Sequence, residues 1–96
     1  MGFVVIATWT AKQGEAGHVA EVIAKLTPGN RAEPKNLVFQ GHRSTDDPNT
    51  FVLYERYTDA SGYEDHKATD AFQTHVVGDG IPRLESRAVS TFTTLD

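Results

Sequence analysis

The sequence predicts an α+β domain, with a four-stranded antiparallel sheet and two helices on one face. Three observations predict it. Apolar and β-branched residues gather in segments of strand length, amphipathic segments of helical spacing separate them, and a strong turn at 46–49 joins the two middle strands directly. The resulting order β-α-β-β-α-β is the ferredoxin-like arrangement. The 96 residues fit a single domain spanning 1–96.

The first half of the chain supplies one strand and one helix. In the segment 3–11, the odd-numbered and the even-numbered positions both carry apolar or small residues, which is typical of a strand covered on both faces. A turn at 12–14 follows, and a first helix is predicted over 15–27, where Pro28 and the next glycine end it. Its apolar row is Val19, Val22, Ile23 and Leu26.

The second half supplies three strands and a helix. Strands are predicted at 37–44 and 50–57, joined as a hairpin. A helix begins near Ala60 after an oxygen cap from Thr58 or Asp59, and Thr69 caps a second helical segment. Gly78-Asp79-Gly80 and Pro82 predict an irregular link, followed by a fourth strand at about 86–95.

The stretch from Phe51 to His75 carries most of the chemically useful residues. Alternation along its strand places Glu55 on the same face as Phe51 and Leu53, whereas Tyr54 and Arg56 point to the opposite face. Residues three apart in the helix, Ala60, Tyr63 and His66, lie on one side, which we expect to face the sheet; Phe72, His75 and Val76 form the next inward row.

Composition excludes several classes of function. The net charge is −4, with 9 basic and 13 acidic residues and no basic cluster, so we expect no nucleic-acid partner and no anionic membrane partner. No apolar run approaches the roughly 20 residues of a membrane span, and a cytoplasmic protein is expected. The lack of cysteine leaves histidine, carboxylate, tyrosine and arginine chemistry.

A second copy of the chain is the expected partner. A chain of this length has a limited interior, and two helices on one face leave the other face of the sheet bare. The segments 3–11 and 86–95 offer apolar or small uncharged residues to both faces. We therefore expect a homodimer in which the second faces are buried against each other.

Three short motifs are similar to those of a known family. They are Arg31-x-Glu33-Pro34, Phe51-x-Leu53-Tyr54-Glu55-Arg56-Tyr57-x-Asp59 and His66-x-x-Thr69-x-x-Phe72. Together with the opening Lys12-x-Gly14, they resemble the antibiotic biosynthesis monooxygenase family of dimeric α+β barrels over nearly the full chain. One departure is Lys35-Asn36, where the family usually has glycine after the Glu-Pro pair.

The resemblance implies a homodimer whose sheets face each other, with a small-molecule cavity between sheet and helices in each subunit. Family members include cofactor-free oxygenases of aromatic polyketides, quinol monooxygenases, an isomerase of a phosphorylated sugar and haem-degrading relatives. The haem-degrading branch is disfavoured, because the asparagine of its first strand would fall near Ala7 and the tryptophan of its second helix near His66. No cofactor and no metal are expected.

His66 and Glu55 are the predicted catalytic residues. The family motif has a histidine at the position of His66, and a neutral imidazole can take a proton from a phenol or an enol. A buried histidine that bonds a backbone carbonyl or Glu55 explains the same pattern. Glu55 needs a partner if it is ionised, and it either orients a histidine or clamps an arginine or backbone groups.

Several further side chains are candidates for substrate contact. Aromatic residues, including Phe39 and Phe92, suit a cavity for an aromatic ligand, although plain core packing explains them as well. Two polar residues on one face of the second strand suit a polar ligand or simple solvation. The side chains predicted to contact a substrate are Trp9, Asn36, Gln40, Tyr63, Phe72 and His75.

Three functions are consistent with these residues. The leading hypothesis is a cofactor-independent monooxygenase of an electron-rich aromatic, quinol or polyketide-type small molecule, with dioxygen as co-substrate. The second is an isomerase of a small polar carbonyl compound, in which His66 and Glu55 move a proton. The third is a dimer that binds a ligand without converting it.

Overall fold

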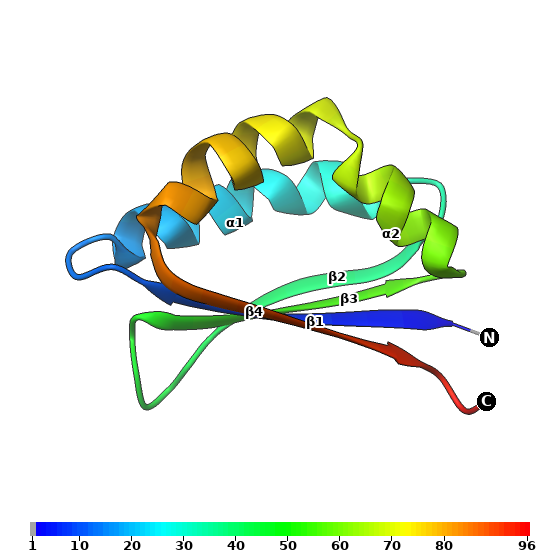
Figure 1. Ribbon diagram of the computed structural model, residues 1–96, viewed down its shortest axis with the longest axis horizontal. Helices are drawn as coiled ribbons and strands as arrows, with labels where there is room; N and C mark the ends of the chain where they lie inside the picture. The colour runs from blue at the N-terminus through cyan, green and yellow to red at the C-terminus, as the bar shows by residue number, and fades with distance from the viewer. Residues whose placement is uncertain (1) are drawn as a thin grey trace.

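The computed structural model describes residues 2–96 and confirms the β-α-β-β-α-β order (Figure 1). A segment of π-helix, η1, and a short 3-10 helix, η2, connect the second helix to the last strand. The elements are β1 (Phe3–Ala11), α1 (Ala16–Arg31), β2 (Asn36–Arg43), β3 (Thr50–Tyr57), α2 (Ala60–Lys67), η1 (Phe72–Gly80), η2 (Ile81–Arg83) and β4 (Leu84–Thr93).

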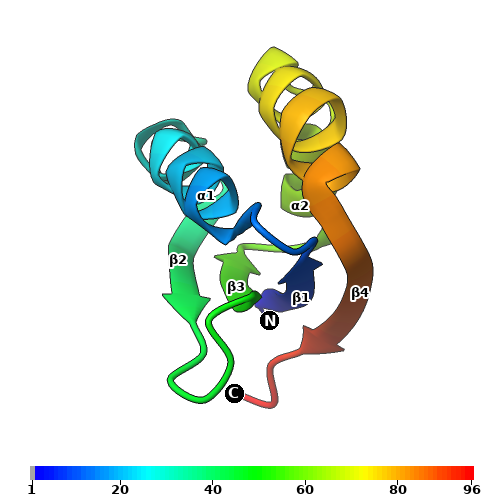
Figure 2. The ribbon, with the colours of Figure 1, turned by 90° about the vertical axis from the view of Figure 1, so that its left-hand side faces the viewer.

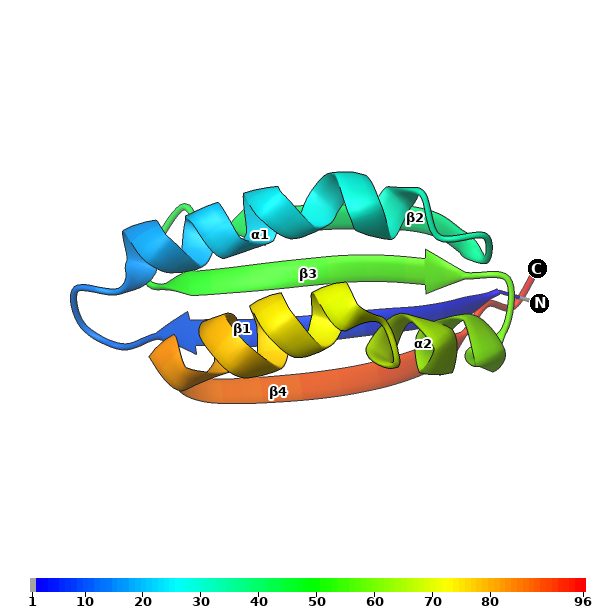
Figure 3. The same cartoon turned by 90° about the horizontal axis from the view of Figure 1, so that it is seen from above.

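The sheet has the order β2-β3-β1-β4, and all three neighbouring pairs are antiparallel. Both helices lie on one face (Figure 2). Seen from above, α1 follows β2 and β3, whereas α2 and η1 follow β1 and β4 (Figure 3). No helix within residues 2–96 is long and apolar enough to cross a membrane.

The core lies between the sheet and the helices. Trp9 of β1 and Leu53 of β3 are buried beneath Val19, Val22 and Leu26, which follow one another at helical spacing on α1. Burial of these apolar side chains is the main force that holds the helices on the sheet.

The prediction that the first helix ends at Pro28 is wrong. The helix α1 continues through Pro28 to Arg31. A proline inside a helix removes one hydrogen bond, but the extra turn buries Asn30 four residues after Leu26 on the inward row. Tertiary packing therefore outweighs the local cost of the proline.

The predicted irregular link at 78–80 is also wrong, because these residues belong to η1. A Cβ placed at Gly80 would lie 3.3 Å from the His75 carbonyl oxygen, which is a tight approach, and in ordinary contact with Val22 and Trp9. The strand β4 begins at Leu84, two residues earlier than predicted, because Leu84 is buried and pairs with Ala11.

The caps and strand faces predicted for the stretch from 51 to 75 are confirmed, and His66 is buried as expected, but Ala60, predicted on the same inward side, is exposed because it lies in the first turn at the end of α2. Asp59 caps α2 by accepting a hydrogen bond from the Ser61 backbone N–H at 2.9 Å, and Thr69 accepts one from the Phe72 N–H at 3.1 Å. Glu55 is buried on the helix side, and Tyr54 lies on the outer face.

Candidate functional site

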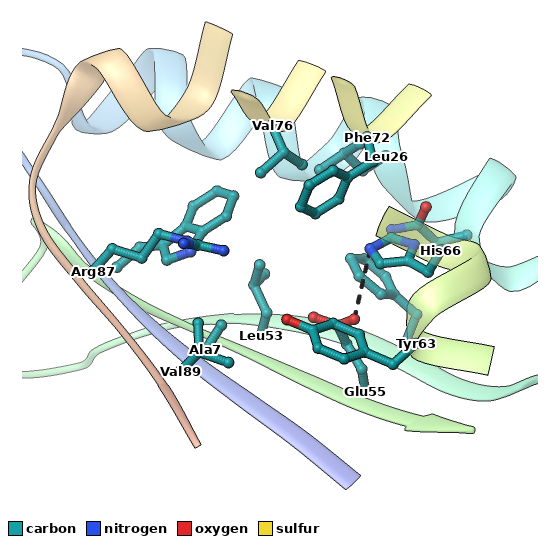
Figure 4. Close-up of a pocket in the computed structure, with 13 residues that line it drawn as sticks. Ala7, Leu26, Leu53, Glu55, Tyr63, His66, Phe72, Val76, Arg87 and Val89 are labelled. Atoms are coloured by element: carbon teal, nitrogen blue, oxygen red, sulfur yellow. Dashed lines mark ion pairs between the residues drawn. The ribbon is translucent and has the colours of Figure 1, made fainter. Parts of the chain in front are cut away.

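A small cavity lies between the sheet and the helices, and every strand and helix except η2 contributes to its walls (Figure 4). Its volume is about 20 Å³, which is the room of about one water molecule. The lining residues are Ala7, Trp9, Leu26, Asn30, Phe39, Leu53, Glu55, Tyr63, His66, Phe72, Val76, Arg87 and Val89. Apolar walls with a few polar groups are typical of small-molecule sites.

His66 lies at one end of this cavity. The capped first turn of α2 places it one turn after Tyr63 on the inward side, where its side chain is 3% exposed. Its ring lies against three aromatic rings, with centroids 5.1 Å from Phe72, 5.9 Å from Tyr57 and 6.3 Å from Tyr63. The imidazole is therefore held among aromatic side chains and shielded from solvent.

The orientation of the His66 ring is set by Glu33, which follows α1. Its carboxylate oxygens lie 3.0 and 3.2 Å from His66 Nδ1. A carboxylate only accepts, so this contact favours the tautomer with the proton on Nδ1. In that tautomer Nε2 carries the lone pair, and Nε2 lies 3.7 Å from Glu55 Oε1 (Figure 4).

Glu55 occupies the cavity floor beside His66. The Tyr57 hydroxyl donates to Glu55 Oε1 at 2.7 Å, and burial raises the pKa of the Glu55 carboxyl above its ordinary value. Burial and the neighbouring Glu55 carboxylate raise the pKa of Tyr57 as well. The distances assign the orienting contact on His66 to Glu33, and place Glu55 close by as a second group able to carry a proton.

The structure brings together most of the side chains predicted to form a site. Trp9, Tyr63 and Phe72 line the cavity with His66 and Glu55, and Phe39 joins them. Phe92 does not, because it pairs with Val4 on the outer face of the sheet and is 51% exposed.

Three predicted substrate contacts lie outside this cavity. Asn36 and Gln40 were expected on one face of the second strand, but a bulge between Asn36 and Val38 places them on opposite faces. Asn36 pairs with Tyr57, whereas Gln40 pairs with Tyr54. Asn36 and Gln40 line a different, surface hollow. His75 is half-buried on η1 and does not line the cavity.

Sequence reasoning assigned no role to Glu33, Asn30 or Arg87. The first two follow Leu26 at spacings of seven and four residues, so an α1 continued across Pro28 would have brought them near the inward row. Arg87 lies on β4, where the sequence alone gave no register. Within residues 2–96, no group of three or more His, Asp or Glu side chains is arranged to hold a metal.

Fold and site together define a ferredoxin-like domain with a small internal cavity lined by aromatic, apolar and a few polar side chains. The family model for antibiotic biosynthesis monooxygenases matches residues 2–77. The chain therefore belongs to the antibiotic biosynthesis monooxygenase family, which confirms the resemblance of the motifs. No protein of curated function matches the chain at a significant level.

Solved structures share this fold. A protein from Nitrosomonas europaea that bears the family name is 26% identical, with 98% of this chain and 99% of that chain covered and a TM-score of 0.91. A protein from Shewanella oneidensis is 25% identical, covers 95% and 88% of the two chains and has a TM-score of 0.90. SnoaB from Streptomyces nogalater, a cofactor-independent oxygenase, is 17% identical, with coverages of 99% and 94% and a TM-score of 0.85.

Proposed function

We propose that the chain is a cofactor-independent monooxygenase of a phenol or quinol. The observation that carries this proposal is the placement of His66, whose Nδ1 is bound to Glu33 while Nε2 faces an aromatic cavity. Membership of the family supports it, and the fold is shared with an oxygenase that needs no cofactor.

The reaction requires a base and a shielded site. Nε2 of His66 takes the proton of the substrate hydroxyl, and the electron-rich phenolate gives one electron to dioxygen. The two radicals combine to form a C–O bond at a ring carbon that carries hydrogen. Loss of that ring proton and cleavage of the O–O bond, with His66 returning a proton to the departing oxygen, yield a quinone and one water. One oxygen atom is retained and the other leaves as water, so no external reductant is needed.

The surroundings of His66 suit this role. The Glu33 carboxylate stabilises the imidazolium that forms after proton transfer. The apolar walls exclude water, which strengthens electrostatic interactions inside the cavity. Because the cavity holds about 20 Å³, an aromatic substrate enters only when side chains that line it move.

The test is oxygen uptake with a panel of hydroquinones, naphthols and anthrones. His66→Ala should lower kcat by roughly 100-fold or more, the usual effect of removing a general base. His42→Ala is the control, since His42 is exposed on β2 away from the cavity. Unchanged oxygen uptake in His66→Ala would remove the proposed role.

A second candidate function is isomerisation of a small carbonyl compound. The observation that favours it is the pair of proton carriers, Glu55 and His66, 3.7 Å apart on one side of the cavity. Such a reaction consumes no dioxygen and exchanges a carbon-bound proton with solvent. Deuterium incorporation without oxygen uptake would therefore select this candidate.

We also infer that the chain works as a homodimer through the outer face of its sheet. Phe92 is exposed there opposite Val4, and Ile6 of β1 with Val52 and Tyr54 of β3 extends the apolar surface. Apolar side chains gathered on one uncovered face are typical of an interface. Sedimentation equilibrium should give twice the mass of the chain.

A further inference from the structure

Two buried donor groups in the cavity wall have no acceptor. Trp9 Nε1 and Asn30 Nδ2 form no hydrogen bond to any group in residues 2–96, although the residues are 2% and 1% exposed. Leaving a donor buried and unpaired costs roughly 1–3 kcal/mol. Both residues line the same cavity, so both costs can be relieved by one ligand.

Part of the acceptor capacity near the cavity is already engaged. Glu55 accepts from the Tyr57 hydroxyl, and Glu33 accepts from His66. The remaining acceptors, His66 Nε2 and Glu55, lie 3.7 Å apart at one end of the cavity, and neither accepts from Trp9 or Asn30. A complementary ligand brings the acceptor oxygens itself.

A positive charge lies at the far end of the cavity from His66. Arg87 of β4 forms no ion pair within residues 2–96, and Figure 4 shows its side chain reaching along the wall opposite His66. The inward side chains of β4 are exposed, so the cavity opens beside Arg87 and Val89. An unpaired guanidinium at the mouth favours a ligand that carries negative charge.

We propose that Trp9 and Asn30 are the donors that determine the specificity of this cavity, and that its ligand is a planar aromatic anion with at least two oxygen acceptors, such as an ionised hydroxyquinone. Trp9 and Asn30 bind these oxygens, and Arg87 offsets the charge. This inference deepens the proposed function and rests on it only in using the same cavity, because it concerns binding and not oxygen chemistry.

The test uses two probes that differ in one oxygen. The first is 2-hydroxy-1,4-naphthoquinone, which is an anion at neutral pH, and the second is 1,4-naphthoquinone. The chain has a single tryptophan and no cysteine, so one indole N–H signal reports on Trp9, and no thiol adds to the quinones. On titration, the hydroxyquinone should bind more tightly and move the indole proton signal downfield, as expected for a new hydrogen bond.

Two variants separate the donors from simple packing. Trp9→Phe keeps an aromatic ring without the N–H and should weaken binding of the hydroxyquinone about tenfold or more, the effect expected for a charge-assisted hydrogen bond. Asn30→Asp replaces the amide donor by a negative charge and should abolish that binding. Both should weaken binding of 1,4-naphthoquinone less, because its two carbonyl oxygens accept from the same donors without the gain of a negative charge. Gln40→Leu, which removes an exposed amide outside the cavity, is the control.

The proposal is overturned if both probes bind equally or if neither binds. It is also overturned if the indole signal does not move on binding, which would mean that water alone meets these donors. The indole measurement needs only the wild-type protein, so a variant that fails to fold does not end the test. Selective binding without oxygen uptake would leave this inference in place while the proposed oxygenase activity fails.

Discussion

Replacement of Glu33 by glutamine tests how His66 is positioned. The contact from His66 Nδ1 to the Glu33 carboxylate is 3.0 Å, and the two side chains are only 3% and 16% exposed. With charge centres about 4 Å apart and an effective dielectric constant near 20, the ion pair formed when His66 is protonated is worth about 4 kcal/mol. Glutamine keeps the shape and loses the charge.

The expected consequence lies in kcat. Glutamine can still accept a hydrogen bond from His66, and this bond retains about 1 kcal/mol of the 4 kcal/mol stabilisation of the imidazolium. A loss of roughly 3 kcal/mol in the step that forms the imidazolium lowers kcat about 100-fold, while KM changes little. Glutamine can also present its amide N–H to Nδ1, which would move the imidazole proton to Nε2 and remove the base.

Two measurements check this reasoning. Oxygen uptake gives kcat and KM for Glu33→Gln, and nitrogen-15 NMR of the His66 imidazole shows which ring nitrogen carries the proton. The wild-type protein should show the proton on Nδ1, and the variant a mixture of the two tautomers. A folded Glu33→Gln protein with unchanged kcat and an unchanged tautomer would refute the assignment of Glu33 as the positioning residue.

Two further variants address stability and assembly. Burial raises the pKa of Glu55, so the native protein binds its proton more tightly than the unfolded chain, and the stability linked to this proton is present in acid and lost as the pH rises through the folded pKa. Glu55→Gln should therefore raise the free energy of unfolding at pH 7, and thermal unfolding should show this increase disappearing towards pH 4. Each unit of pKa shift corresponds to about 1.4 kcal/mol of that free energy. An increase independent of pH would contradict this reasoning. Phe92→Glu should convert the dimer to a monomer in sedimentation equilibrium, and a dimer of unchanged affinity would place the interface elsewhere.

Much of the fold could be predicted from the sequence because the signals are local. Alternation in 50–57 fixes which side chains face inward, and turn residues at 46–49 fix the hairpin. The errors occurred where tertiary packing overrides local preference. Pro28 marks a helix end by itself, but Asn30 is buried only two residues later. Gly80 marks a loop by itself, but it is buried in η1 beside Val22 and Trp9.

The site was only partly predictable, because it depends on register between segments distant in sequence. Alternation and helical spacing were sufficient for Glu55 and His66. Glu33 and His66 are 33 residues apart, and their contact follows from how α1 and α2 pack. The bulge at Asn36 reverses the face of one residue, and no turn residue signals it.

The strand β4 links the cavity to the proposed dimer. It is an edge strand that pairs only with β1, and its residues after Leu84 are exposed nearly to the end. Arg87 faces the cavity from this strand, and Phe92 faces outward. The strand at the cavity opening therefore also contributes to the proposed dimer interface. If the partner holds β4 in place, a monomeric Phe92→Glu protein should bind the hydroxyquinone more weakly even though Phe92 is outside the cavity. Dimerisation would then be part of how the site is built, since within one subunit the strand that carries Arg87 pairs on one edge only, with β1.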